Sequence, residues 1–210
     1  MIYIIGDSHC AIFTVINDKY MVPEYQLMET LNFCSYRTKP FTAYNLKTKI
    51  GHIEEIIKTL NIQKNDYIIF SYGEVDIRCH LGFYSPDSNM LNKNIKECVD
   101  RYIEFLLYFK KKFGNIGVWS PIASGGYNGM NGNGRPSYKT KEERNNNTNK
   151  FTILLKEECS KHKIIFKSIY DKLITNEGET IDAYYADGLH LNITAQPLVI
   201  NKFKDLLSLK

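Results

Sequence analysis

The sequence predicts a single α/β domain, residues 1–210, in which a mainly parallel sheet lies between two layers of helices. Short apolar runs of four to six residues alternate with longer segments whose apolar residues recur at helical spacing. Each short run stops at polar or glycine-bearing sequence, as a buried parallel strand does at the carboxyl edge of its sheet. The chain is also long enough to bury a full core in one such unit.

These patterns place the elements in order. Five strands are expected, at Ile2–Ile5, Leu31–Tyr36, Tyr67–Ser71, Ile116–Ser120 and Ile164–Ser168. Four helices are expected, at His52–Leu60, Asn92–Phe113, Lys141–His162 and Ala195–Leu207. The apolar residues of the second helix share one face: Ile95, Val99, Tyr102, Ile103, Leu106 and Phe109. Strands that alternate with helices in this way predict a three-layer, flavodoxin-like α/β/α fold with about five strands.

Two segments interrupt this alternation and are expected to be loops. Cys79–Met90 follows the third strand and carries Gly82 and Pro86. Ala123–Tyr138 follows the fourth strand and holds five glycines, too many for a regular element. Because it follows a parallel strand, we expect it at the same sheet edge as Ser8, which follows the first strand. Several aromatic and polar side chains lie in or beside this loop: Trp119, Tyr127, Asn128, Arg135 and Tyr138. They would suit a sugar or another polyhydroxylated ligand. A polar loop that binds no ligand explains them equally well.

The composition is that of an ordinary globular protein, with 43% hydrophobic and 24% charged residues. No apolar stretch is long enough to span a bilayer, and the N-terminus lacks the basic and apolar regions of a secretory signal. We therefore expect no membrane insertion and a cytoplasmic location. The net charge is +4, but the lysines are scattered, so nucleic-acid binding is not indicated. The sequence leaves the oligomeric state open.

The cysteines, histidines and glycines argue against three kinds of site. Five widely spread cysteines without a Cys-x-x-Cys pair argue against a disulfide framework and a zinc knuckle. His9, His80 and His190 lack metal-ligand spacing, so no metal is expected. Gly125-Gly126 lacks the lysine and the helix of a phosphate-binding loop, so no nucleotide cofactor is expected.

Two segments near the ends of the chain carry candidate catalytic residues. The first apolar run ends at Gly6-Asp7-Ser8, which places a serine hydroxyl at the carboxyl edge of the sheet. Asp187 and His190 stand three residues apart, so the carboxylate can orient the imidazole within one loop. A serine needs such a base to act as a nucleophile, and the three residues together predict a serine hydrolase. The alternative is an ordinary turn at Ser8 and a helix-capping role for Asp187.

The same segments resemble the SGNH or GDSL-type serine hydrolases. The first block of that family is an apolar strand followed by Gly-Asp-Ser, and its last block is Asp-x-x-His, in the same order as Gly6-Asp7-Ser8 and Asp187-Gly188-Leu189-His190. The resemblance implies a flavodoxin-like fold and ester cleavage through an acyl-serine. It also implies that Ser8 is the nucleophile, His190 the base and Asp187 the residue that orients it.

The third block of the family, Gly-x-Asn-Asp, is matched in part by Gly73-Glu74-Val75-Asp76. Val75 replaces the asparagine that helps to hold the oxyanion, and Arg37–Leu46 has no glycine to serve as the second block. The form Gly-Glu-x-Asp-x-Arg, which ends at Arg78, is similar to a divergent branch of the family often encountered with surface-glycan genes.

This third block supplies the remaining site candidates. Gly73, Glu74, Asp76 and Arg78 are expected to contact the oxyanion or the substrate, with the Arg78 guanidinium in place of the missing amide. The alternative is an ion-pair network of Glu74, Asp76 and Arg78 that holds the loop. His9 and His80 lie beside these segments, where each either contacts substrate or supports the site, and Cys10 is expected to be a buried thiol.

The expected function is that of a serine hydrolase which needs no cofactor. By resemblance, its substrate is a small-molecule or glycan ester, most plausibly an O-acetyl group on a carbohydrate. Two alternatives stay open. A glycan O-acetyltransferase would use the same acyl-serine and pass the acyl group to a hydroxyl instead of water. A non-catalytic glycan-binding or scaffold protein would keep the fold after loss of the oxyanion donors.

Overall fold

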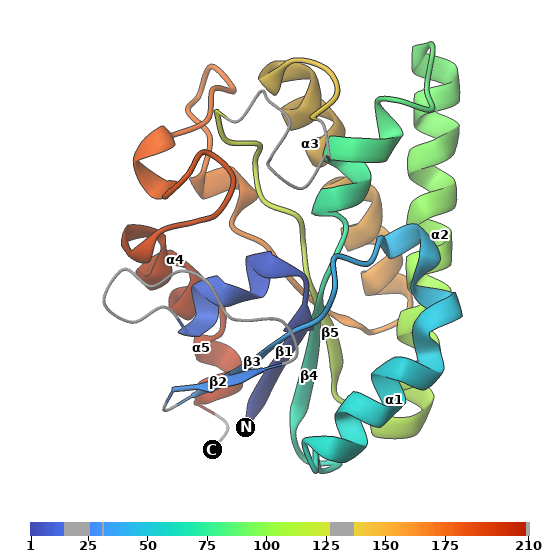
Figure 1. Cartoon of the computed structure of the whole chain (residues 1–210), viewed down its shortest axis with the longest axis vertical. Coiled ribbons are helices and arrows are strands. Elements are labelled where there is room, and N and C mark those ends of the chain that lie inside the picture. Colours follow the sequence, from blue (N-terminus) through green and yellow to red (C-terminus); the bar gives the residue numbers. More distant parts are fainter. Residues whose placement is uncertain (15–25, 31, 127–136, 209–210) are drawn as a thin grey trace.

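The computed structural model describes residues 1–14, 26–30, 32–126 and 137–208, and they form a three-layer α/β/α structure (Figure 1). The six strands of its sheet have the order β2-β3-β1-β4-β5-β6. Their bounds are Ile2–Gly6 (β1), Leu27–Glu29 (β2), Phe33–Arg37 (β3), Tyr67–Ser71 (β4), Ile116–Trp119 (β5) and Ile165–Lys167 (β6). All neighbours are parallel except β2 and β3. The predicted fold class is therefore confirmed, with β2 as an additional antiparallel edge strand.

Strand β1 lies between β3 and β4 at the centre of the sheet. Its residues Ile2, Ile4 and Ile5 are fully buried, because layers of helices cover both faces of the sheet. In the register of the sheet, Gly6 at the end of β1 stands opposite Arg37 of β3 and Ser71 of β4. The three central strands thus end together at one carboxyl edge.

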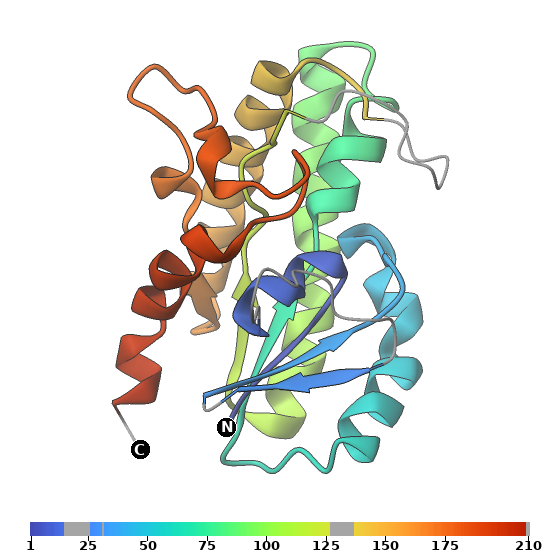
Figure 2. The ribbon, with the colours of Figure 1, turned by 60° about the vertical axis from the view of Figure 1, so that its left-hand side comes forward.

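Five α-helices cover the sheet: Ile50–Thr59 (α1), Ser88–Phe113 (α2), Lys141–Lys161 (α3), Gln196–Lys202 (α4) and Lys204–Leu207 (α5). The first three share one core with the sheet, in which Phe70 packs against Phe105 and Phe109. Helices α4 and α5 pack on the opposite face, where Phe203 meets Phe13 and Trp119 (Figure 2). Among the described residues, no helix is both long enough and apolar enough to cross a membrane.

Short helices complete the described part of the chain. Their bounds are Ser8–Thr14 (η1), Ala43–Lys49 (η2), Asp76–Leu81 (η3), Tyr170–Lys172 (η4), Asp182–Tyr184 (η5) and Ile193–Ala195 (η6). Helix η3 has π-type hydrogen bonding and the others are 3-10 helices. Helices η1, η2 and η3 follow β1, β3 and β4, so all three stand at the carboxyl edge.

Two of the expected boundaries are wrong. Cys79–Met90 is not one loop, because its first residues belong to η3 and its last residues open α2, where Asp87 caps the helix by accepting a hydrogen bond from the Met90 N–H at 2.8 Å. Ala195–Leu207 is not one helix, because α4 ends where Phe203 turns its ring into the core. Most of the expected loop Ala123–Tyr138, including Tyr127, lies outside the described residues.

The close approach of β1 and β4 at Gly6 yields a first prediction. A Cβ at Gly6 would lie 2.5 Å from the Ser71 carbonyl oxygen, so Gly6→Ala is expected to lower the free energy of unfolding by about 1–3 kcal/mol, the usual cost of overpacking. Gly51→Ala is the matched control, because a Cβ at Gly51 in α1 meets no atom within 4 Å. We expect this variant to be stabilising by up to about 1 kcal/mol. Urea unfolding measures both, and equal stabilities would contradict the prediction.

Candidate active site

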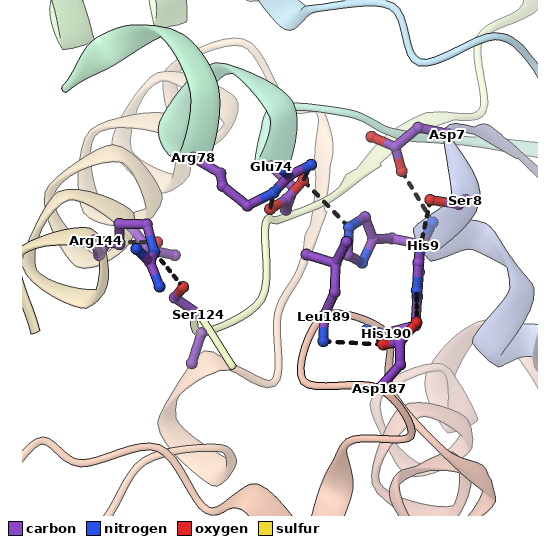
Figure 3. A network of polar contacts seen from close by, with 12 residues as sticks. Asp7, Ser8, His9, Glu74, Arg78, Ser124, Arg144, Asp187, Leu189 and His190 are labelled. Atoms are coloured by element: carbon purple, nitrogen blue, oxygen red, sulfur yellow. Dashed lines mark hydrogen bonds and ion pairs between the residues drawn. The ribbon is translucent and has the colours of Figure 1, made fainter. Parts of the chain in front are cut away.

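Ser8, His190 and Asp187 lie together at the carboxyl edge of the sheet (Figure 3). Ser8 begins η1 and is separated from β1 by Asp7 alone, whereas the other two residues lie in the loop between η5 and η6. The His190 Nε2 atom is 2.8 Å from the Ser8 Oγ atom, and its Nδ1 atom is 2.7 Å from Asp187 Oδ2. The structure therefore joins the hydroxyl, imidazole and carboxylate in one chain of hydrogen bonds.

The Asp187 carboxylate organises its own loop. Its Oδ1 atom accepts hydrogen bonds from the backbone N–H groups of Leu189 at 2.9 Å and His190 at 2.7 Å. Gly188 has φ of +74°, a left-handed value that lets the chain close this tight turn. Partial burial raises the pKa of Asp187, but the bonds from the His190 ring and backbone outweigh it and hold the pKa below its ordinary value. The carboxylate is thus an ionised partner for the imidazole.

Packing against the segment after β5 sets the position of the His190 loop. A Cβ at Gly125 would lie 2.1 Å from the Gly188 carbonyl oxygen, so the two backbones are in direct contact. The Tyr185 hydroxyl donates to the Ala123 carbonyl oxygen at 2.5 Å. Tyr185 also forms an antiparallel bridge with Leu191 across the loop. These contacts bring His190 to a serine that lies 182 residues earlier in the chain.

The turn that carries Ser8 is held by Asp7, which is almost completely buried. Asp7 Oδ1 accepts a hydrogen bond from the His9 N–H at 3.0 Å, and the Asp7 carbonyl oxygen accepts one from Cys10 at 3.1 Å. Its own N–H donates to the Ser71 carbonyl oxygen of β4 at 3.3 Å. Burial raises the pKa of the Asp7 carboxyl, while the neighbouring His9 lowers it. Asp7 thereby ties η1 to the central strands.

Glu74 and Arg78 form an ion pair behind Ser8. The Arg78 Nε and Nη2 atoms donate to Glu74 Oε1 at 2.6 Å and to Glu74 Oε2 at 3.3 Å. Glu74 Oε2 also lies 3.3 Å from His9 Nε2. Gly73, with φ of +114°, turns the chain from β4 into this position. Burial raises the pKa of Glu74, but Arg78 and His9 hold it far below its ordinary value. Arg78 therefore faces Glu74, where we had expected it to face the oxyanion.

Asp76 lies in a different environment from the Glu74–Arg78 pair. Its carboxylate accepts hydrogen bonds from the backbone N–H groups of Ala43 at 2.7 Å and Tyr44 at 3.1 Å, and from the Cys98 thiol at 3.4 Å. It thus anchors η2 to η3 and α2, and the expected three-residue ion-pair network is reduced to two residues. Val75, which stands between Glu74 and Asp76, is a buried core residue.

The remaining candidates are dispersed. Trp119 is 1% exposed and packs edge-on against Phe13, so it belongs to the core and not to a ligand surface. Cys10 is buried as expected, and burial raises the pKa of its thiol. His80 stacks on Tyr84 and lines a cavity of about 370 Å³ between η2, η3 and α2. Within the described ranges, no group of three or more His, Cys, Asp or Glu side chains could hold a metal ion.

Comparison with known proteins shows which fold the chain shares. Neither a scan against protein-family models nor a search of curated proteins found a match. Solved structures do match, among them a Streptococcus pneumoniae protein described as a "putative platelet activating factor", with a TM-score of 0.65 and 15% identity over 98% of this chain and 83% of that one.

Two esterases have the same fold as this chain. The acetyl xylan esterase AlAXEase matches with a TM-score of 0.58 and 12% identity, over 98% of this chain and 99% of its own. The acetylxylan esterase Axe2 from Geobacillus stearothermophilus matches with a TM-score of 0.54 and 13% identity, over 96% and 91% of the two chains. The α/β/α sheet of this chain is thus the fold of these esterases.

One pairing at the site was not predicted. The contact between His9 and Glu74 joins the turn after β1 to the turn after β4. The sequence signal for it was the histidine directly after Ser8 together with the glutamate directly after Gly73, since neighbouring parallel strands release their chains at the same edge.

The environment of Asp76 predicts a pH effect on stability. Burial raises its pKa to about 6 against an ordinary 3.8, and the backbone hydrogen bonds from Tyr44 and Ala43 only partly oppose this. Because the folded-state pKa is the higher one, its contribution to stability is full below about pH 4 and is lost as the pH rises through about 6.

The variant Asp76→Asn removes this titration. The difference between the free energies of unfolding of the variant and of wild type is expected to change in favour of the variant by on the order of 2–3 kcal/mol as the pH rises from about 4 to about 7. Urea unfolding of both proteins across this range measures the difference, in which the other titrating groups cancel. A difference that does not change with pH would contradict the assignment.

Proposed function

We propose that the protein is a serine hydrolase that cleaves a small ester through an acyl-serine intermediate. The observation that carries the proposal is the continuous hydrogen-bonded chain from the Ser8 hydroxyl through His190 to Asp187. Two further facts support it. The chain stands at the carboxyl edge of the sheet, where α/β proteins place their active sites, and the fold is shared with acetylxylan esterases.

Each residue of the chain has a distinct role in the proposed reaction. Ser8 Oγ attacks the ester carbonyl carbon as His190 Nε2 takes its proton, and the imidazolium then protonates the departing alkoxide. The acyl group is now bonded to Ser8. His190 next removes a proton from a water molecule, whose oxygen attacks the acyl carbon. The bond from that carbon to Ser8 Oγ then breaks, and the imidazolium returns the proton to Ser8 Oγ as the acid departs. The ionised Asp187 holds the ring in the correct tautomer throughout.

The developing oxyanion needs hydrogen-bond donors, each of which can contribute on the order of 3 kcal/mol. The backbone N–H of Ser8 is the first candidate, because Ser8 begins η1 and the first amides of a helix have no partner within it. Asp7 engages the amides of the next two residues, His9 and Cys10. We propose that the Ser8 amide donates to the oxyanion.

For the substrate, we propose an O-acetyl group on a carbohydrate. Two of the matching solved structures are acetylxylan esterases. In addition, the cavity beside η3 adjoins a second cavity of about 430 Å³ at the same sheet edge. Aromatic and polar side chains line the two, a combination that suits a polyhydroxylated ligand: Tyr44, Asn45, His80, Phe83, Tyr84, Asn94 and Tyr138.

Labelling with a fluorophosphonate tests the nucleophile directly. The probe is expected to phosphonylate Ser8 with loss of fluoride, because His190 activates this hydroxyl. The variant Ser8→Ala is expected to remain unlabelled, whereas Ser160→Ala, at an exposed site on α3, is expected to be labelled like wild type. Intact-mass spectrometry measures the adduct. Absence of an adduct on folded wild-type protein would overturn the proposed function.

Turnover of p-nitrophenyl acetate tests the base and its partner. Ser8→Ala and His190→Ala are each expected to lower kcat by at least about 10⁴-fold. Asp187→Asn is expected to lower it by on the order of 10³–10⁴-fold, because the carboxamide no longer holds the imidazole in its tautomer. A variant of His190 with unchanged kcat would contradict the assigned roles.

A further inference from the structure

The proposed reaction leaves one group of buried charges without a role. Glu74, Arg78 and His9 lie directly behind Ser8, and their side chains are only 13%, 6% and 7% exposed. Burial of charged groups is costly unless they are paired with good geometry. A sheet edge that needed only to end its strands would be filled more favourably by apolar side chains, so this charged group calls for an explanation.

The contacts run in one direction, from Arg78 toward the candidate catalytic residues. Arg78 grips both oxygens of Glu74, at 2.6 and 3.3 Å. A Glu74 oxygen lies 3.3 Å from His9 Nε2. The His9 ring lies against the ring of His190, with centroids 5.0 Å apart and planes tilted by 33° (Figure 3). His9 is also the next residue after Ser8. One side chain therefore joins the ion pair to both the nucleophile and the base.

The charges of the cluster hold the His9 ring in place. Burial lowers the pKa of His9, but the hydrogen bond to Glu74 and the charges of Asp7 and Glu74 raise it above its ordinary value, against a smaller effect of Arg78. The groups that face His9 are thus Asp7, Glu74, Arg78 and His190. The contact with Glu74 at 3.3 Å and the packing against the His190 ring leave the His9 ring little freedom to turn.

A small cavity lies beside the His9 ring. The cavity is about 10 Å³, close to the least volume that holds one water molecule, and Asp7, His9 and Trp119 help to line it. Each of these residues carries a buried polar atom without a hydrogen-bond partner among the described residues: Asp7 Oδ2, His9 Nδ1 and Trp119 Nε1.

We propose that Glu74, clamped by Arg78, positions Ser8 and His190 through the side chain of His9. This inference rests on the proposed hydrolase function. Glu74, Arg78 and His9 are positioning residues, because they act on the nucleophile and the base and do not touch the reacting atoms. A misplacement of catalytic groups by about 1 Å costs on the order of a hundredfold in rate. The network therefore acts on kcat and leaves substrate binding unchanged.

A double-mutant cycle tests the proposal on the full-length chain. Glu74→Gln keeps the shape of the side chain and removes its charge, and His9→Asn removes the ring but leaves the Glu74–Arg78 pair intact. Each variant is expected to lower kcat for p-nitrophenyl acetate by on the order of tenfold to a hundredfold with little change in KM. The double variant is expected to lose no more than the larger single loss, because both changes break one pathway. Additive losses, or an unchanged kcat, would overturn the proposal.

Two further measurements separate positioning from general destabilisation. Arg78→Lys keeps the positive charge but cannot form the bidentate contact with Glu74, so its kcat is expected to lie between those of wild type and Glu74→Gln. Tyr102→Phe is the structural control, because it removes a buried hydrogen bond to Phe70 in the helical core. It is expected to lower the free energy of unfolding without a change in kcat. A loss of kcat in Tyr102→Phe equal to that in Glu74→Gln would show that the effect is one of stability alone.

An NMR titration distinguishes failure of this proposal from failure of the hydrolase function. The ring nitrogens of His9 are expected to titrate at a lower pH in Glu74→Gln than in wild type, and this readout does not depend on turnover. If Ser8 takes no fluorophosphonate but the shift is seen, the hydrolase function fails and with it the catalytic purpose of the network. If Ser8 is labelled but the His9 titration does not move, the proposed coupling of Glu74 to His9 is wrong.

Discussion

Strand β1 passes through the centre of the sheet, and the backbone contact that it makes at Gly6 controls how the turn with Ser8 lies beside the turn with Glu74. Gly6 stands between Arg37 and Ser71, so close to β4 that no Cβ fits. From this point the chain turns at Asp7 into η1 and presents Ser8. The chain that leaves β4 at Ser71 turns through Gly73 and presents Glu74 beside it. The distance between β1 and β4 therefore sets the distance between the turn that carries Ser8 and the turn that carries Glu74.

A second constraint follows from the burial of charge at this edge. Asp7 and Glu74 are acidic, His9 and Arg78 are basic, and each is held by hydrogen bonds or by an opposite charge. In a low-dielectric environment such a cluster is stable only when its members are all present and correctly placed. The Val75 side chain is buried in the core. The side chains of Glu74 and Arg78 are also largely buried, and Glu74 contacts His9 of η1.

The periodic apolar patterns were sufficient to predict the five parallel strands, because a strand covered on both faces must be apolar along its length. They could not predict β2, which has three residues and lies at the edge, or the π-helix η3, whose register depends on the contact of Asp76 with η2. Ser8, His190 and Asp187 could be named as candidates from the sequence, because a serine, a histidine and an aspartate in short segments suit such chemistry, and the structure brings the three together. The pairing of Arg78 with Glu74 was one of the two alternatives that the sequence left open, and the contacts of Asp76 with Ala43 and Tyr44 were not predicted, because they depend on how η2 packs against η3.

Trp119 illustrates the same limit, since an aromatic residue at the end of a strand suits a ligand surface as well as a core, and only its contacts with Phe13 and Phe203 place it in the core. By itself the sequence determined the α/β/α class, the strand that delivers Ser8, and the local turn in which Asp187 meets His190, since each depends on residues close together in the chain. Only the tertiary structure decided that the last loop reaches Ser8 and that Glu74 pairs with His9. Those distances depend on close backbone contacts between distant segments, such as Gly125 with Gly188, and no local pattern encodes them.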